Sequence, residues 1–319
     1  MKVVMIIFFC NFVRNLTNTK YCLMKKTLLS VIIATLTTFT LLSCGDEGGM
    51  LANPDATINP SDPNGNPNNP NNPNNPNNTP KCYVSEIKNT EDGQSYTTKF
   101  TYNSKNLLET KDEDGFVTKY EYDANNRITK MIIDDSGVGT VETFSYEYDG
   151  KGNISKVKYD SEGGMAELLI SEYIYTTNAK GQVEKIQAVS PDGPIDLLFE
   201  YDANSNIKKI SVTDGAQKIT LLENLKFDTK SNVYTNTNLS KAYLPHIVVT
   251  TLFGINMTYL FNTNNILSDS VISFLTGEAE VSTYDYGYTP EGFPSKMTAV
   301  RKYDGETYKE EETYNYTCK

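Results

Sequence analysis

Aromatic side chains recur in closely spaced pairs from residue 81 to residue 319. In Tyr146-Glu-Tyr148 two aromatics flank a charged residue, and Tyr120-Glu-Tyr122 and Phe199-Glu-Tyr201 repeat the pattern. Successive side chains of a β-strand point to opposite faces, so positions i and i+2 share one face. These segments therefore predict strands that have one aromatic face and one polar face.

A turn signal follows each aromatic pair. Asp or Asn comes next and then Asn or Gly, residue types that suit tight turns. An aliphatic residue lies six positions after the second aromatic and predicts a return strand at Leu108, Ile128, Ile154, Ile207, Val233 and Leu267. A second series of turn signals, such as Asp114-Gly115 and Asp214-Gly215, alternates with the first. Two alternating series of turns predict consecutive hairpins.

The hairpins together predict an all-β domain over residues 81–319, a single antiparallel meander of about 16–18 strands that is curled or closed into a barrel-like sheet. The aromatic stripe on its inner face comprises Tyr102, Tyr120, Tyr122, Tyr146, Tyr148, Tyr173, Tyr175, Tyr201, Phe227, Phe261 and Tyr288. Charged residues between the aromatics predict a sheet that does not span a membrane, because a membrane barrel needs an apolar outer band. The apolar run 242–261 coincides with the widest repeat spacing, and we interpret it as buried strands plus an insertion.

The first 43 residues contain five basic residues and no acidic one. Read from Met24, two lysines precede an apolar stretch that ends at Leu41-Leu42-Ser43-Cys44, an arrangement typical of a signal peptide. This ending resembles a bacterial lipobox, which implies removal of residues 1–43 and acylation of Cys44. A single transmembrane anchor is the alternative, although the stretch is shorter than the about 20 residues of a spanning helix.

Residues 44–80 predict a disordered tether. Between Leu51 and Pro80 the chain has 12 Asn, 8 Pro and no aromatic residue, so it cannot bury a core. Asp46 and Glu47 just past Cys44 resemble the signal that sends Bacteroides-type lipoproteins to the cell surface. We therefore expect an outer-membrane protein, anchored by acyl chains and facing the cell exterior, with the periplasmic face as the alternative.

The fullest copy of the repeat, Tyr146–Ile154, follows the pattern Tyr-x-Tyr-Asp-x-x-Gly-x-Ile. It resembles the YD repeats of bacterial RHS proteins, which implies a hollow β-shell. With the leader and the tether, residues 24–319 are also similar to a Bacteroides-type surface lipoprotein family of unknown function with a porin-like fold. RHS shells enclose a C-terminal toxin segment, but this sequence stops at Lys319, so we do not extend encapsulation to it.

Composition narrows the chemistry. The sequence has one histidine, 40 acidic and 29 basic residues, and a formal charge of −11. This charge argues against nucleic-acid binding, which needs clustered Lys and Arg, and a single histidine leaves no multi-histidine metal site. We expect no enzyme, cofactor or metal. A hydrolase that acts through paired carboxylates stays open, because Asp and Glu are plentiful.

Cys82 and Cys318 lie at the first and last predicted strands. In the oxidising cell envelope they are candidates for a disulfide that would join the two ends of the meander. Two free thiols are the alternative, because the bond requires Cα atoms within about 7 Å of each other.

Four short motifs have simple structural interpretations. The run 112–115 (Asp-Glu-Asp-Gly) lacks the later ligands of a calcium loop, so we interpret it as a hairpin turn. We interpret His246 as a packed loop histidine and Glu310–Glu312 as a solvated strand edge. The run 269–271 (Asp-Ser-Val) resembles a bacterial O-glycosylation pattern, which makes Ser270 a candidate acceptor.

The aromatic stripe has two interpretations. Large side chains can fill the concave side of a one-layer sheet, and tyrosine also offers a flat ring with a polar tip that suits sugars or peptides. We favour core filling. The expected function is that of a cell-surface lipoprotein with an extracellular binding, structural or adhesive role. A carbohydrate-binding accessory protein of a glycan-uptake system is the alternative.

Overall fold

The computed structural model describes residues 81–91, 93–135, 140–162, 170–191, 193–214, 217–274, 277–303 and 306–319. The leader and tether predicted for residues 1–80, and with them Cys44, lie outside the described residues. The described domain begins at Lys81.

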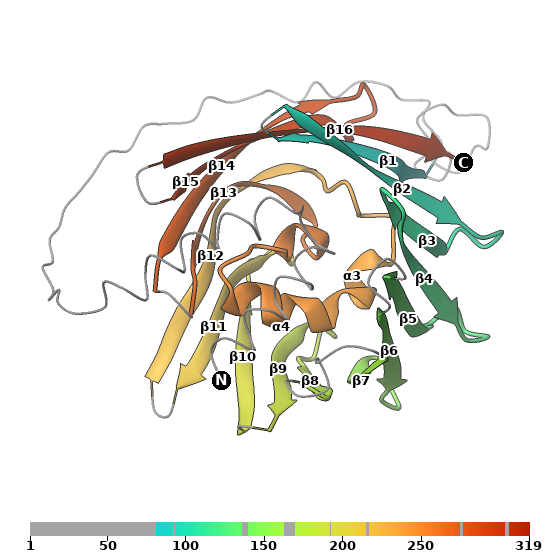
Figure 1. The fold of residues 1–319 in the computed structure, drawn as a ribbon, viewed down its shortest axis with the longest axis vertical. Coiled ribbons are helices and arrows are strands. Elements are labelled where there is room, and N and C mark those ends of the chain that lie inside the picture. The colour runs from blue at the N-terminus through green and yellow to red at the C-terminus, as the bar shows by residue number, and fades with distance from the viewer. Residues whose placement is uncertain are drawn as a thin grey trace, which may run out of the picture. The chain divides into compact units, whose positions relative to one another are not determined.

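The domain is a closed antiparallel barrel of 16 strands (Figure 1). The strands are β1 (Cys82–Glu91), β2 (Gln94–Tyr102), β3 (Leu108–Glu113), β4 (Phe116–Tyr122), β5 (Ile128–Asp135), β6 (Thr140–Tyr148), β7 (Ile154–Glu162), β8 (Glu172–Thr177), β9 (Val183–Ser190), β10 (Gly193–Tyr201), β11 (Ile207–Asp214), β12 (Gln217–Ser231), β13 (Asn264–Ile272), β14 (Ala279–Tyr288), β15 (Pro294–Tyr303) and β16 (Glu306–Cys318). Each strand pairs with the next, and β16 pairs with β1. The predicted meander is confirmed, and it closes.

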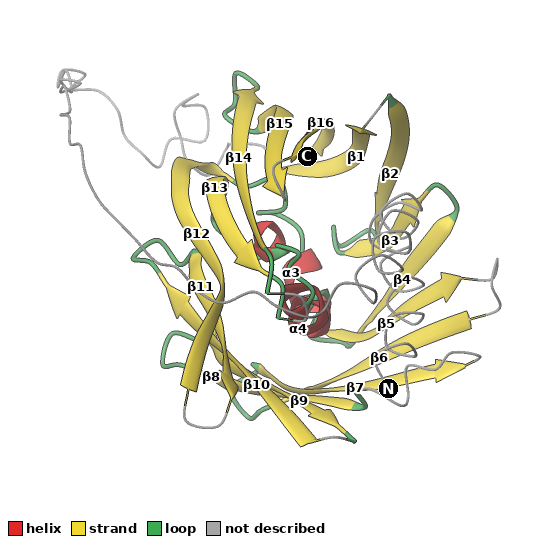
Figure 2. Cartoon of the chain, turned by 60° about the vertical axis from the view of Figure 1, so that its left-hand side comes forward, coloured by secondary structure: helices red, strands yellow, loops and turns green. Residues whose placement is uncertain are grey.

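Between β12 and β13, residues 232–263 leave the sheet and form α3 (Leu239–Ala242), α4 (Leu244–Leu252) and η3 (Thr258–Leu260). Both helices lie within the ring of strands (Figures 1 and 2). Helix α4 carries proline in its first turn, and Ile247 and Val248 are fully buried. Among the described residues, no helix is both long and apolar enough to cross a membrane.

The predicted insertion at 242–261 is therefore confirmed, but the buried strands expected there are wrong. A helix satisfies its own backbone hydrogen bonds, so it can be buried inside the barrel without a strand partner. A short apolar run does not distinguish a buried strand from a buried helix by its periodicity.

The outer face of the sheet is polar, as predicted. Glu121, Glu147 and Glu200 lie between the aromatics and are exposed, whereas their neighbours Tyr120 and Tyr146 are buried. The exposed glutamates include members of cross-strand ion pairs with lysines, which contribute little to stability in water. Charged positions of this kind do not fit the apolar outer band of a barrel in a bilayer.

The turn after an aromatic pair recurs with the same geometry. At Asp149, the carboxylate Oδ1 accepts hydrogen bonds from the backbone N–H groups of Lys151 and Asn153, both at 2.8 Å. Gly152 between them has φ of 85°. Equivalent side-chain acceptors are Asn103, Asp123, Asn178 and Asp202. The acidic or amide residue of the repeat is thus an internal cap that fixes the turn.

The second aromatic links one hairpin to the hairpin before it. The hydroxyl of Tyr148 donates a 2.7 Å hydrogen bond to the carbonyl of Ile128, the first residue of the preceding return strand. The same tyrosine link joins Tyr102 to Val84, Tyr122 to Leu108, Tyr201 to Val183 and Tyr316 to Pro294. Phenylalanine at this position would fill the same space without linking neighbouring repeats.

In the copy around Tyr173 and Tyr175 the predicted frame is wrong by two residues. Thr177, rather than Tyr175, pairs with Val183 at the start of the return strand, and Asn178 caps the turn. Both tyrosines are nevertheless buried. The pair that precedes this turn is Tyr175 and Thr177. Tyr173 lies on the same strand face two residues before Tyr175, so the sequence pattern places the aromatic pair two residues too early.

The hairpin between β12 and β13 is opened by the insertion. Phe227 pairs with Ile266, which lies 39 residues later, where an intact repeat has six. Asp228 still caps this turn, because its Oδ1 accepts from the backbone N–H groups of Lys230 and Asn265, both at 3.0 Å. Asn265 therefore completes a turn that begins before the insertion.

Two predicted repeat copies are wrong in this region. Val233 lies near the start of the insertion and begins no return strand, and Phe261 follows η3 instead of lying on a strand. Leu267 lies inside β13 and does not begin it. The sequence pattern matched by chance because aromatic, Asp and Asn residues also suit the turns of an irregular insertion.

The closing pair β16–β1 has the register of an intact hairpin, but the two ends of the domain replace the turn. Tyr316 pairs with Val84, and the register shifts between Val84 and Glu86. A shift at the same position lies between Glu147 and Tyr148 in the hairpin of β6 and β7. The sheet thus closes as an additional copy of its own repeat.

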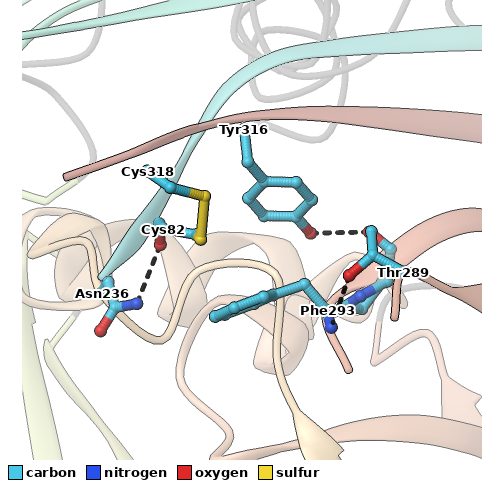
Figure 3. The surroundings of a disulfide bond; sticks show 7 residues. Cys82, Asn236, Thr289, Phe293, Tyr316 and Cys318 are labelled. Carbon is cyan, nitrogen blue, oxygen red and sulfur yellow. Dashed lines mark hydrogen bonds between the residues drawn. A yellow bond between two sulfur atoms is a disulfide. The ribbon is translucent and has the colours of Figure 1, made fainter. Parts of the chain in front are cut away.

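The disulfide predicted between Cys82 and Cys318 is present and joins these two ends (Figure 3). Lys81 and Lys319 next to them exchange both backbone hydrogen bonds at 3.0 Å. The cysteines therefore occupy the adjacent non-hydrogen-bonded pair, where cross-strand side chains approach most closely. Asn236 of the insertion donates a 2.8 Å hydrogen bond to the carbonyl of Cys82. The disulfide takes the place of the missing turn.

Candidate functional site

The inner wall of the barrel has two halves of different chemistry. We call the first the apolar half, formed by β4–β12. Its inward side chains are mostly buried hydrocarbon or aromatic groups, including Met131, Phe144, Val157, Ile186, Leu197 and Ile210. Helix α3 packs on β5 and α4 on β12, so the insertion covers this half. Burial of this apolar surface favours the folded state.

Polar groups of the apolar half are tied to the insertion. Tyr146 donates a hydrogen bond to the carbonyl of Ala242. The imidazole of His246 on α4 lies 4.7 Å from the ring of Phe144 and 4.9 Å from that of Tyr243, measured between centroids. Burial, followed by the charge of Lys111, lowers the pKa of His246 to about 3. His246 is therefore a neutral packing group near pH 7, as predicted, although it lies on a helix and not in a loop.

The second half, which we call the polar half, is formed by β13–β16 and β1–β3. The strand register places a mixed set of carboxylates, amides, phenols and cations on its inner side: Asp269, Ser282, Tyr286, Arg301, Glu310, Glu312, Tyr314, Asn89, Lys111 and Glu113. Residues that alternate with them, such as Lys309 and Thr313, are exposed on the outside. This half thus presents hydrogen-bonding groups where the apolar half presents hydrocarbon.

Glu310 and Glu312 of β16 meet Asn89 of β1 in the polar half. The Asn89 amide Nδ2 donates to Glu310 and lies 3.4 Å from Glu312 Oε1. Arg301 forms an ion pair with Glu310, and Tyr314 donates a 2.5 Å hydrogen bond to Glu312 Oε2. Burial, followed by the charge of Glu310, raises the pKa of Glu312 to about 7. Glu312 is therefore partly protonated at neutral pH.

Lys111 and Glu113 of β3 form another charged pair in the polar half. The Lys111 ammonium lies 2.8 Å from Glu113 Oε2 and 5.2 Å from the centroid of the Tyr243 ring. Burial alone would lower the pKa of Lys111, but Glu113 and Tyr243 raise it above its ordinary value. This cation is therefore fully charged and balanced by its neighbour.

Two tyrosines of the insertion lie between these charged groups. The ring of Tyr259 is 6.0 Å from that of Tyr234, which is in turn 6.5 Å from Phe100 on β2. Burial, followed by the charge of Glu312, raises the pKa of both phenols. Tyr259 nevertheless keeps 39% of its surface exposed. Water therefore reaches this ring, although charged residues of both β3 and β16 act on it.

Asp269 of β13 completes the polar half. It is fully buried, and its Oδ2 accepts hydrogen bonds from Asn256 of the insertion and, at 2.9 Å, from Tyr284. Its Oδ1 has no hydrogen-bond partner among the described residues. Burial raises the pKa of this carboxyl. Ser270 beside it is half-buried in the middle of β13, and its O-glycosylation stays a prediction.

The structure separates the aromatic stripe into two roles. Tyr120, Tyr146, Tyr173 and Tyr175 are buried on the inner wall, and Tyr102, Tyr122, Tyr148 and Tyr201 form the tyrosine links. Tyr288 donates to the turn cap Asp228 instead. Core filling and hairpin linking therefore account for most of the stripe.

Other predicted motifs have mixed outcomes. The run 112–115 is a hairpin turn, as predicted, in which Asp112 Oδ1 accepts a 2.8 Å hydrogen bond from the backbone of Gly115. The interpretation of Glu310–Glu312 as a solvated strand edge is wrong, because β16 has a partner on each side. Sequence reasoning missed the polar half. The sequence feature that indicates it is the spacing of Glu310, Glu312 and Tyr314, which places two carboxylates on the same strand face as an inward aromatic residue.

Comparison with known proteins agrees with the repeat. Residues 102–138 match the family model RHS Repeat, and this segment contains β3–β5 and covers less than half of the chain. The RHS-type repeat predicted from sequence is therefore confirmed for this segment. The sequence has no significant match among curated proteins.

Among solved structures, the chain is similar to a porin-like protein from Bacteroides uniformis, with 16% identity and a TM-score of 0.44, over 73% of this chain and 96% of that chain. It is also similar to a porin-like protein from Bacteroides vulgatus, with 10% identity and a TM-score of 0.43, over 74% and 99%. A third similarity is to the TcdB2-TccC3-Cdc42 structure, with 15% identity and a TM-score of 0.32, over 73% of this chain and 14% of that chain.

Proposed function

We propose that this protein is an outer-membrane lipoprotein, anchored by acyl chains on Cys44, whose barrel acts as a binding module on the cell exterior. The observation that carries the proposal is the disulfide between Cys82 and Cys318. Structural disulfides form and persist in oxidising compartments such as the periplasm and the cell surface. A reducing cytoplasm would leave the two ends of the sheet without their covalent link.

Two further features support an exported binding module. The outer face carries charged residues, which suit an aqueous environment around the barrel. The inner wall carries a polar half that water reaches at Tyr259. A catalytic role has less support, because His246 is a neutral packing group and the Lys111 and Arg301 cations are already paired with carboxylates.

The anchor is tested by expressing the full-length protein and its Cys44→Ser variant in a Bacteroides host and labelling with an alkyne analogue of palmitate. We expect label and membrane association only when Cys44 is present. Protease treatment of intact cells then tests orientation, and we expect loss of the barrel epitope without lysis. Equal labelling of both proteins would contradict acylation at Cys44, and full protection in intact cells would favour the periplasmic face.

A carbohydrate-binding role is a second candidate within the same proposal. It is favoured by the grouping of tyrosines with carboxyl and amide side chains in the polar half, because phenol rings can pack on sugar rings while the polar groups hydrogen-bond to their hydroxyls. The carboxylate-based hydrolase is a third, to which Glu310 and Glu312 are the most suitable residues, since one amide of Asn89 reaches both.

A further inference from the structure

The polar half contains a group of side chains that the fold leaves accessible. We define the interior cluster as Asn89, Tyr234, Tyr259, Tyr286 and Glu312. Four of its members are half-buried, and Tyr259 is 39% exposed. They come from β1, β14, β16 and the insertion, which are far apart in the sequence, so the barrel and its insertion are both needed to assemble the cluster.

The charge balance of the cluster points to a neutral ligand. Lys111 is paired with Glu113, and Arg301 with Glu310, so neither cation is left to attract an anion. Among the described residues Glu312, the carboxyl of the interior cluster, has no cation as an ion-pair partner, and it accepts a hydrogen bond from Tyr314. An anionic ligand would be repelled by these carboxylates, and a cation would find no carboxylate that is fully ionised and unpaired among them.

The side-chain types specify the ligand further. Phenol rings offer flat apolar faces that pack on the C–H faces of sugar rings, while their hydroxyls stay hydrogen-bonded. The carboxyl of Glu312 and the amide of Asn89 supply donors and acceptors for ring hydroxyls. Asp269 adds a buried oxygen that lacks a partner among the described residues. Its charge also helps to raise the pKa of Tyr286, although burial, Glu312, Asp228 and Tyr288 contribute more. Such a combination of apolar faces and convergent polar groups is typical of small-molecule sites.

We propose that the interior cluster binds a neutral oligosaccharide, with Tyr259 as the stacking platform and Glu312 and Asn89 as the hydrogen-bonding groups. This inference rests on the proposed function, because it names the ligand class of the exported binding module. Binding needs the ligand to enter the ring of strands and contact the polar half. The apolar half is covered by the helices and makes no contact with the sugar.

The test is calorimetric titration of the detergent-solubilised full-length protein with neutral hexaoses of the α-glucan, β-glucan and mannan types. We expect at least one series to bind, and Tyr259→Ala to weaken that binding about tenfold or more, because a central aromatic anchor contributes at least this much. The matched control is Phe274→Ala, which truncates another aromatic of similar exposure, 43%, in the β13–β14 connection. It should leave the affinity unchanged.

A second variant separates a binding role from a structural one. Glu312→Gln keeps the hydrogen-bonding shape of the side chain but cannot ionise. The titratable and polar neighbours of Glu312 are Glu310, Arg301, Tyr314 and Asn89 on the sheet. The phenols of Tyr234, Tyr259 and Tyr286 face it from the insertion and from β14. We expect the native affinity to change between about pH 6 and 8, as Glu312 ionises, and the variant to bind with an affinity that is constant over this range.

Failure to bind any of the three hexaoses, or binding that Tyr259→Ala leaves intact, would overturn the inference. Tyr259-dependent binding of a polyamine or of an uncharged peptide instead would also overturn it, because the ligand class would differ. If no oligosaccharide binds but the protein is acylated and exposed on the cell surface, the ligand class is wrong and the proposed function is still supported. Hydrolysis of the sugar during titration, detected by mass spectrometry, would contradict the non-catalytic part of that function.

Discussion

In the apolar half of the inner wall, His246 of helix α4 packs against Phe144, and Ile247 of the same helix is fully buried. In the polar half the inward side chains include carboxylates, amides and phenols beside apolar groups such as Ile87 and Met297, and Tyr259 remains accessible to water. Exposed hydrocarbon inside a wide barrel would be unfavourable, so the apolar half requires a cover, and the insertion supplies it. A polar wall has no such requirement, so it can stay solvated and available to a ligand.

The same contrast appears in what holds each half together. The apolar half is stabilised by packing between sheet and helix. The polar half has less buried hydrocarbon, and it contains the seam where β16 meets β1. The disulfide and the tyrosine link of Tyr316 stabilise this seam. Elsewhere in the polar half, Lys111 and Arg301 form ion pairs with carboxylates.

Removing the disulfide is expected to have the largest effect. The bond joins residues 236 positions apart, so its loss frees almost the whole described chain in the unfolded state. We expect the paired variant Cys82→Ser with Cys318→Ser to lose about 2–5 kcal/mol of unfolding free energy in urea titrations. Hydrogen exchange should rise first in β1 and β16, and a uniform rise over all strands would contradict a locally held seam.

Truncating the helix in the apolar half should come next. Ile247→Ala leaves a cavity between α4 and the wall, and we expect a loss of about 2–4 kcal/mol in the same titration. The control in the polar half is Glu312→Gln, which opens no cavity and should change stability by less than about 1 kcal/mol at about pH 4, where the carboxyl of Glu312 is largely protonated in both the folded and the unfolded protein. Similar losses for both variants would mean that the two halves do not differ in packing.

The tyrosine links provide a smaller and more local comparison. Tyr148→Phe, in the apolar half, and Tyr316→Phe, at the seam, each remove one hydroxyl that bonds a backbone carbonyl. We expect each to lose about 1 kcal/mol by thermal or urea unfolding. When the disulfide is reduced, the loss for Tyr316→Phe should grow, whereas that for Tyr148→Phe should not. If reduction changes the loss of unfolding free energy equally for both variants, the Tyr316 hydrogen bond does not stabilise the seam together with the disulfide.

The last expected effect is on the pH dependence of stability, which compares one variant across conditions. The pKa of Glu312 is raised to about 7 in the folded protein from an ordinary value of 4.5. Between these values the folded state holds a proton that the unfolded state has lost, so stability falls as the pH rises and levels off above about pH 7. Glu312→Gln should reduce this fall, measured by urea unfolding at several pH values. Asp269 contributes in the same direction and remains in the variant. A slope identical to that of the native protein would rule out Glu312 as a source.

The sequence predicts the sheet well because the repeat is local. The cap at Asp149, the aromatic pair before it and the aliphatic residue after it lie within nine residues, so each hairpin can be read alone. Closure of the sheet is not local, yet Cys82 and Cys318 indicated it because two cysteines at the ends of a meander have few other partners.

What the sequence could not predict depends on contacts between distant segments. Asn265 completes the turn of Asp228 across the whole insertion, and nothing near either residue marks the pair. The apolar run of α4 fits a strand or a helix equally well until the barrel interior is known to be its environment. Likewise, Glu312 and Tyr259 become one cluster only once η3 lies inside the ring of strands to which β16 belongs.

The central claim is that water and ligand reach the polar half but not the apolar half. The direct measurement is the reaction rate of a single introduced thiol with a charged, water-soluble methanethiosulfonate reagent, in Tyr259→Cys and in Ile247→Cys. With the native disulfide intact and the unmodified protein as background, we predict rapid labelling at 259, almost none at 247, and equal labelling of both in urea. Slow labelling at position 259 in the native barrel, equal to that at 247, would contradict the account.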